Sequence, residues 1–401
     1  MNKETAIYMW FVCTCLIVAL SGLTKVREAS AMLSAIDDAS NATPFQMNRG
    51  AIFTENEAIA AALGDLVSYL IAAIQHGEIP SDLITENDQQ RHAFFIATLQ
   101  RLKARSDSAW ISPLVLKSFS PDGDETFLIT IAFMRAQDDR SQINKIIEFH
   151  AYPHNGSYRF RSPFDYRTRS LNIEDVVEVR YHVQSSIDRA HAEAFVEFKR
   201  EFEARLGMQT TNLDYYCFET LDELLRAYGI VYDCGKCNWL KEDLGFMDNN
   251  GRAFITGTGN ERFIFDYLVD YMSHFCDDDE DLYPPFVIGM AAYYGGYGLS
   301  GDDVETLKAQ FRAELAARPD MDFLEEFRKG RQSSIERHFT YFVISAFLCE
   351  DVLERHDFDA VMRLARTGRS GERFFTMLEE LLEIDESNFH AHIVELIRDD
   401  A

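Results

Sequence analysis

The stretch ERFIFDYLVDYMSHFCDDDEDLYPPFVIGMAAYYGGYG occupies residues 261–298 and carries most of the information about the fold. Its first part has apolar residues at helical spacing. A short acidic loop follows, then two adjacent prolines, then a segment of glycine, alanine and tyrosine. Because proline favours the first turn of a helix, this order predicts a helix, an acidic loop and a second segment that starts at the Pro-Pro step.

The bulk composition sets limits on the protein class. The chain has 401 residues, which is enough for two domains with separate cores. It is 47% hydrophobic and 13% aromatic, as expected of a globular protein rather than a disordered one. The formal net charge of −27 argues against binding to nucleic acid or to anionic lipid, because both need a basic surface. We therefore expect no nucleic-acid partner.

The N-terminus predicts export. Residues 7–20 form an apolar run that is short for a membrane span and suits a signal peptide. Ala19 and Ser21 are small residues in the positions expected before cleavage at Gly22. Residues 1–21 are therefore interpreted as a signal peptide, and the mature chain as periplasmic, cell-envelope or secreted. An uncleaved signal anchor is the alternative, and only then do we expect contact with a membrane.

The next part of the chain predicts a linker and an α+β domain. Residues 22–50 are small and polar with no sustained period, which indicates a linker. Residues 51–170 predict two helices followed by an antiparallel sheet, an order that is similar to the cone-shaped fold of nuclear transport factor 2. Asn155-Gly156 is typical of a tight hairpin turn. The predicted helices span 54–76 and 91–103, and the predicted strands span 114–119, 126–133, 145–152 and 157–162.

Residues 173–401 predict a second, mostly helical domain, which makes the whole chain α+β. It begins with a strand, a long amphipathic helix, a second strand and a second helix. We place these at residues 176–183, 185–206, 213–218 and 220–228. Further helices are predicted at 302–317, 321–329, 335–354, 357–366, 370–382 and 386–398.

The quoted stretch resembles the active-site region of the gluzincin peptidases, which belong to the peptidase MA-like group. In that family a His-Glu-x-x-His helix supplies two zinc ligands and a general base. A later segment, commonly Glu-Gly-x-Ala-x-Tyr-x-Gly-Gly, supplies the third ligand. The segment IGMAAYYGG at residues 288–296 is similar to it, with Ile288 in place of the Glu. The resemblance covers residues 173–398 and implies a gluzincin-like domain over 173–401.

Two alignments place this sequence on the His-Glu-x-x-His motif, and neither gives a zinc site. FDYLV at 265–269 lacks both histidines, whereas DYMSH at 270–274 keeps only His274. Apolar side chains cannot bind zinc, and Ile288 removes the third ligand in both alignments. The resemblance thus implies a degenerate member without zinc or catalytic residues. The positions of the degenerate site are Phe265, Asp266, Val269, Asp270, His274 and Ile288.

The cysteines offer a second kind of site. In an oxidising compartment Cys234 and Cys237 could close a small loop, or one of them could join Cys217. The rival is a zinc site made of Cys234, Cys237, His274 and Cys276, since the first pair has suitable ligand spacing. Export favours the disulfide. The acidic run at 277–281 lacks the glycine and the alternating spacing of a calcium loop, so we interpret it as a solvated charge run.

These observations predict a non-catalytic exported protein with no metal cofactor. We expect it to bind a peptide, a protein or a glycan in the former substrate cleft, or to serve as a structural component of the cell envelope. The alternative is a hydrolase or peptidase with a rearranged active site around His274 and nearby carboxylates.

Overall fold

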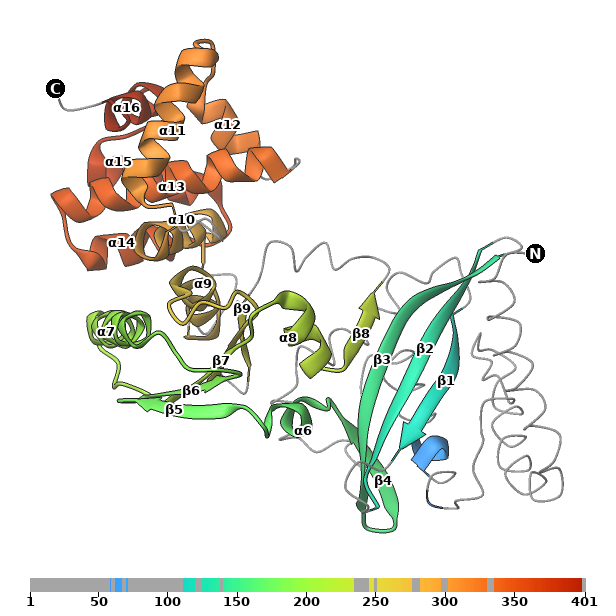
Figure 1. The fold of residues 1–401 in the computed structure, drawn as a ribbon. Helices are drawn as coiled ribbons and strands as arrows, with labels where there is room; N and C mark the ends of the chain where they lie inside the picture. Colours follow the sequence, from blue (N-terminus) through green and yellow to red (C-terminus); the bar gives the residue numbers. More distant parts are fainter. Residues whose placement is uncertain are drawn as a thin grey trace. The chain divides into compact units, whose positions relative to one another are not determined.

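The protein is α+β, with strands mainly in the N-terminal half and helices in the C-terminal half (Figure 1). The structure, a computed structural model, describes residues 58, 62–66, 70, 111–119, 125–137, 140–233, 245–248, 251–275, 282–296, 302–329 and 335–398. The predicted signal peptide, the linker, the helix at 91–103 and most of the helix at 54–76 lie outside these residues. Two compact units divide the chain. The first is Met1–Ser170 with Leu225–Asn238, and the second is Leu171–Leu224 with Trp239–Ala401.

The first unit contains an antiparallel sheet in which consecutive strands are neighbours. A hairpin turn joins its last two strands, as Asn155-Gly156 predicts. Asn155 has φ 52° and Gly156 has φ 83°, the left-handed conformation at both positions that two-residue hairpins favour. The order is β1 (Ile111–Phe119), β2 (Phe127–Gln137), β3 (Arg140–His154) and β4 (Ser157–Arg161). These strands confirm the four predicted from the sequence.

A distant segment also pairs with this sheet. Strand β8 (Ile230–Asp233) runs antiparallel to the middle of β3. Next to it, the N–H of Glu148 donates a 2.7 Å hydrogen bond to the carbonyl of Gly229. Gly229 has φ 88°, and a Cβ there would lie 2.4 Å from the Glu148 carbonyl oxygen, so only glycine fits. The first unit thus includes a strand that comes later in the sequence than Leu171, where the second unit begins.

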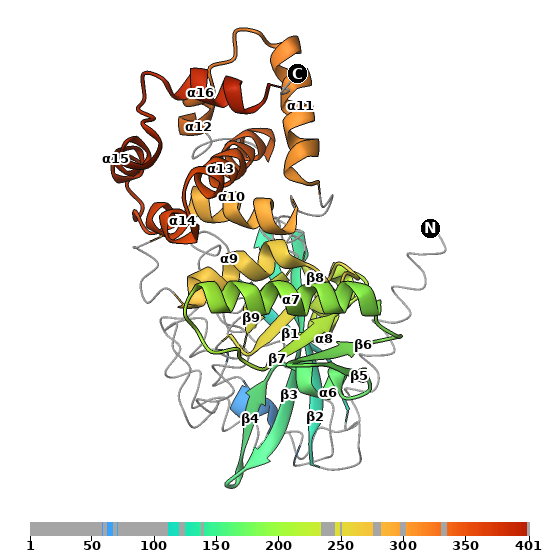
Figure 2. The same ribbon diagram turned by 90° about the vertical axis from the view of Figure 1, so that its left-hand side faces the viewer.

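The second unit contains a mixed sheet with the order β5-β6-β7-β10-β9. The three inner strands are parallel, and each edge strand runs antiparallel to its neighbour. Helices α7 and α9 lie against one face of this sheet (Figure 2). The strands are β5 (Asn172–Val176), β6 (Val179–Val183), β7 (Leu213–Cys217), β9 (Gly245–Asp248) and β10 (Ala253–Thr256). The first helices of this unit are α7 (Arg189–Arg205) and α9 (Ile264–Phe275). Helix α6 (Phe164–Thr168) belongs to the first unit, and α8 (Leu221–Ala227) crosses the boundary between the two units.

The prediction of one strand over 176–183 is wrong. The chain turns at Val177-Glu178, so that β5 and β6 form a hairpin. Val177 has φ 55°, a conformation that β-branched residues rarely adopt, and its side chain is 69% exposed. Because valine normally extends a strand, the sequence contains no turn signal at this position.

Helix α7 carries a buried ion pair that belongs to the core. The Nζ of Lys199 lies 2.8 Å from Oε1 of Glu203, and the two side chains are 1% and 0% exposed. Lys199 also donates a 2.6 Å hydrogen bond to the carbonyl of Thr211, whose hydroxyl donates to Glu203 at 3.0 Å. These bonds offset the cost of removing both charges from water.

The C-terminal helices surround α13, whose central residues are fully buried. It contacts α10, α11, α12, α14 and α16 (Figures 1 and 2). The six helices predicted from residue 302 onward are confirmed, with ends that differ by a few residues. No described helix is both long and apolar enough to cross a membrane. The helices are α10 (Pro284–Gly295), α11 (Val304–Ala317), α12 (Phe323–Lys329), α13 (Ile335–Arg355), α14 (Phe358–Ala365), α15 (Gly371–Leu382) and α16 (Phe389–Leu396).

Candidate functional site

Two carboxylates on α9 cover the outer edge of strand β9. Oδ2 of Asp266 accepts a 2.7 Å hydrogen bond from the N–H of Gly245. Oδ2 of Asp270 accepts a 2.7 Å hydrogen bond from the N–H of Met247. Four residues advance a helix by about 6 Å, and two residues advance a strand by about 6.8 Å, so the two spacings match. Neighbouring N–H groups on the open side of β9 therefore both have charged acceptors.

This arrangement gives Asp266 a structural role. Its side chain is only 4% exposed. A Cβ at Gly245 would lie 2.6 Å from the ring of Phe254 and 3.3 Å from Cβ of Asp266, so glycine allows α9 and β9 to approach closely. An extended peptide that added to β9 would need the same N–H groups. The two aspartates thus close this edge to strand addition.

Three of the remaining positions of the degenerate site carry apolar side chains, and the fourth is a histidine. Phe265 is buried in the hydrophobic core, and Val269 and Ile288 are half-buried and pack against that core. His274 is exposed near the end of α9. Within the described ranges, no three His, Cys, Asp or Glu side chains lie close enough together to hold a metal ion. The apolar side chains of Phe265, Val269 and Ile288 have no atom that can bind zinc.

The small residues of α10 have a packing role. A Cβ at Gly289 would lie 2.2 Å from Cβ of Ser345 on α13. A Cβ at Gly295 would lie 2.6 Å from the backbone nitrogen of Phe265 on α9. The two glycines thus let α10 pack closely against α13 at one point and against α9 at another. Helix packing accounts for Gly289 and Gly295, and Gly296 ends α10 with a φ of 75°, which favours glycine.

The structure changes one part of the cysteine hypothesis. Cys217 is a buried free thiol on β7 rather than a disulfide partner. Burial raises its pKa to about 12, so the thiol stays protonated at neutral pH. Cys234, Cys237 and Cys276 lie outside the described residues, as does the acidic run at 277–281.

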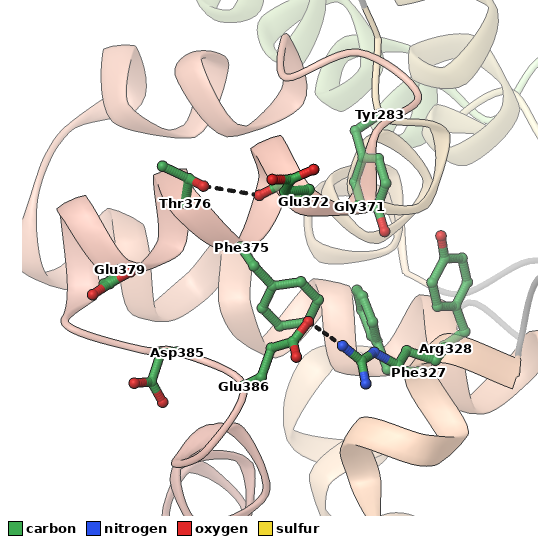
Figure 3. Close-up of a pocket in the computed structure, with 11 residues that line it drawn as sticks. Tyr283, Phe327, Arg328, Gly371, Glu372, Phe375, Thr376, Glu379, Asp385 and Glu386 are labelled. Carbon is green, nitrogen blue, oxygen red and sulfur yellow. Dashed lines mark hydrogen bonds and ion pairs between the residues drawn. The ribbon is translucent and has the colours of Figure 1, made fainter.

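A cavity of about 400 Å³ opens among the C-terminal helices (Figure 3). Its walls come from the start of α10, from α12, α13 and α15, and from the turn before α16, all in the second unit. Aromatic rings and acidic side chains predominate. The lining residues are Tyr283, Phe327, Arg328, Tyr341, Gly371, Glu372, Phe375, Thr376, Glu379, Asp385 and Glu386.

The charges around the cavity are mainly negative. Arg328, the one cation among the described lining residues, is ion-paired with Glu386. The carboxylate of Asp385 accepts hydrogen bonds from the side chain and the backbone of Ser387, and these lower its pKa. Asp385 is therefore ionised at neutral pH. The sequence alone does not reveal this site, because acidic residues on exposed helix faces are common and only tertiary packing brings these segments together.

Comparison of the chain with protein-family models, with curated proteins and with solved structures found no match.

Proposed function

We propose that this chain is a non-catalytic binding protein that takes a peptide or protein ligand. The observation that carries the proposal is the position of Asp266. In the first alignment with the gluzincin motif this residue replaces the general base. A general base must reach a water molecule and accept a proton from it. Asp266 is buried, and it accepts the N–H of Gly245.

The cavity among the C-terminal helices is the site that we assign to the ligand. Its volume of about 400 Å³ is within the usual range of about 300–1,000 Å³ for binding pockets. The α9–β9 region is less suitable, because its edge N–H groups already have acceptors. The apolar run at residues 7–20 is the reason that we place this binding outside the cytoplasm.

The proposal can be tested by measuring metal content, hydrolysis and binding on one preparation. The protein is purified without chelator or histidine tag, analysed by elemental mass spectrometry, and incubated with a fluorogenic peptide library with and without added zinc. We expect less than stoichiometric zinc, no hydrolysis, and saturable binding of some peptides. Stoichiometric zinc together with hydrolysis that is lost in Asp266→Asn would show an enzyme instead. A protein that neither hydrolyses nor binds any peptide would also contradict the proposal.

A further inference from the structure

We propose that the cavity among the C-terminal helices binds an arginine side chain presented by a peptide or protein partner. This inference rests on the proposed function and specifies its ligand chemistry. It depends on three properties of the cavity, which are its aromatic walls, its excess of carboxylates and its size.

One wall presents the half-exposed ring of Phe375, which packs against buried aromatic rings. Tyr283 and Phe327 are buried, whereas Phe375 is half-exposed. The centroid of Phe327 lies 4.7 Å from that of Tyr341 and 6.1 Å from that of Phe375. Figure 3 shows the rings of Phe327 and Phe375 beside the Arg328–Glu386 ion pair. Aromatic faces attract cations, and a planar guanidinium stacks on them.

The carboxylates exceed the positive charge that could neutralise them. Glu372, Glu379, Asp385 and Glu386 line the cavity together with one guanidinium, that of Arg328. Arg328 and Glu386 neutralise each other. The carboxylates of Glu372 and Glu379 are exposed and make no ion pair with any other residue in the part of the chain that the structure describes. With the ionised Asp385, they leave an excess of negative charge that a cationic group can satisfy.

Among cationic groups, the guanidinium of arginine fits this chemistry best. Its plane stacks on aromatic rings, and its fork of N–H donors binds carboxylates in pairs, whereas the lysine ammonium acts as a point charge. The volume of about 400 Å³ leaves room for an arginine side chain and some of its flanking peptide. The net charge of −27 also favours encounter with a basic partner.

The test uses the full chain and a pair of peptides that differ at one group. One is a fluorescein-labelled Gly-Ser-Arg-Ser-Gly peptide, and the other contains citrulline, which has nearly the same shape as arginine but no charge. Binding is followed by fluorescence anisotropy at two salt concentrations. The variants are Glu372→Gln, Glu379→Gln and Phe375→Leu. Glu395→Gln is the matched control, because it removes one exposed charge from α16 outside the cavity.

We expect saturable binding of the arginine peptide that is at least about tenfold weaker for citrulline, which corresponds to about 1.4 kcal/mol. Each glutamate variant and Phe375→Leu should weaken binding severalfold, while Glu395→Gln should leave it unchanged. Equal weakening by Glu395→Gln would show attraction by net charge alone and would overturn the inference. Equal binding of both peptides would do the same.

A further result separates this inference from the proposed function. If another member of the peptide library binds and none of the cavity variants affects it, the chain is a binding protein whose site lies elsewhere. If no peptide binds and zinc-dependent hydrolysis appears, the proposed function itself fails. Circular dichroism of each variant shows whether it is folded, and Phe375→Leu tests the cavity independently of charge.

Discussion

The carboxylate of Asp266, in the first turn of α9, accepts a hydrogen bond of 2.7 Å from the backbone N–H of Gly245 on an edge strand. Asp270, one turn later, does the same for Met247. Edge strands expose unpaired N–H groups that invite pairing with other chains. Here the protein satisfies two of them with its own side chains, so α9 both packs against the sheet and closes its edge.

Removal of the Asp266 carboxylate should destabilise the fold. In Asp266→Ala the buried N–H of Gly245 loses its acceptor, and a buried polar group without a partner costs about 1–3 kcal/mol. We expect the free energy of unfolding in urea to fall by that amount. Asp266→Asn should recover part of the loss, because its amide oxygen can still accept the hydrogen bond.

Asp320→Ala provides the control for this measurement, since Asp320 is exposed in the turn before α12. It should change the free energy of unfolding by less than about 0.5 kcal/mol. If Asp266→Ala lowers the free energy of unfolding by no more than this control does, the carboxylate does not stabilise the strand edge.

The ion pair between Lys199 and Glu203 should show strong coupling. Lys199→Met leaves a buried carboxylate without its counter-ion, which typically costs about 3–5 kcal/mol. The double variant Lys199→Met/Glu203→Leu removes both charges and should recover most of this loss. Urea unfolding of both single variants and the double variant completes a double-mutant cycle. Additive losses would contradict a coupled buried pair.

Gly289 should not tolerate even one added methyl group. In Gly289→Ala the new Cβ would lie 2.2 Å from Cβ of Ser345, so α10 and α13 must separate. Overpacking of this kind costs about 1–3 kcal/mol, which lowers the thermal midpoint. Gly371→Ala is the matched control, because a Cβ there meets nothing within 4 Å. Equal midpoints for the two variants would show that the helices are not packed as closely as described.

The thiol of Cys217 should be unreactive in the folded protein. Its pKa is raised from 9.0 to about 12 by burial, so at pH 8 both protonation and burial protect it from iodoacetamide. Mass spectrometry should find its peptide unmodified in native protein and alkylated in urea. Rapid labelling without denaturant would contradict the burial of this residue.

The same shift predicts a loss of stability in alkali. The folded state holds the proton more tightly than the unfolded state, whose thiol ionises near pH 9. The contribution of Cys217 is therefore complete below pH 9 and declines as the pH rises from 9 to 12. Cys217→Ala should show a shallower decline over that range than the unmodified chain. Equal slopes would contradict the raised pKa.

Much of the fold could be predicted because its signals are local. Asn155-Gly156 favours the left-handed backbone by itself, and the C-terminal helices have apolar residues at regular spacing. The turn at Val177 could not be predicted, because valine does not favour a positive φ. The surrounding sheet holds the residue in this strained conformation. Strand β8 could not be predicted, because four residues carry no clear period and their partners on β3 lie 83 to 88 positions away in the sequence.

The candidate site likewise has features that a local sequence pattern indicates and features that only tertiary packing creates. Asp266 and Asp270 at a spacing of four on an apolar helix are a visible pattern, and it could have suggested that they accept backbone hydrogen bonds. The resemblance directed the interpretation toward lost catalysis instead. The lining of the cavity could not have been predicted, since Tyr283, Arg328 and Glu379 come from separate segments that meet only through tertiary packing.

The pairing of β8 with β3 has a consequence for how the chain can be made and divided. The ribosome must synthesise the chain beyond Asp233 before the first sheet can be complete, by which time the residues of α7 and β7 of the other unit have already been synthesised. A fragment that stops at Ser170 lacks the strand that covers the middle of β3. A fragment that starts at Leu171 carries that strand without its partner. Neither half of the gene, cut at this boundary, encodes a whole unit.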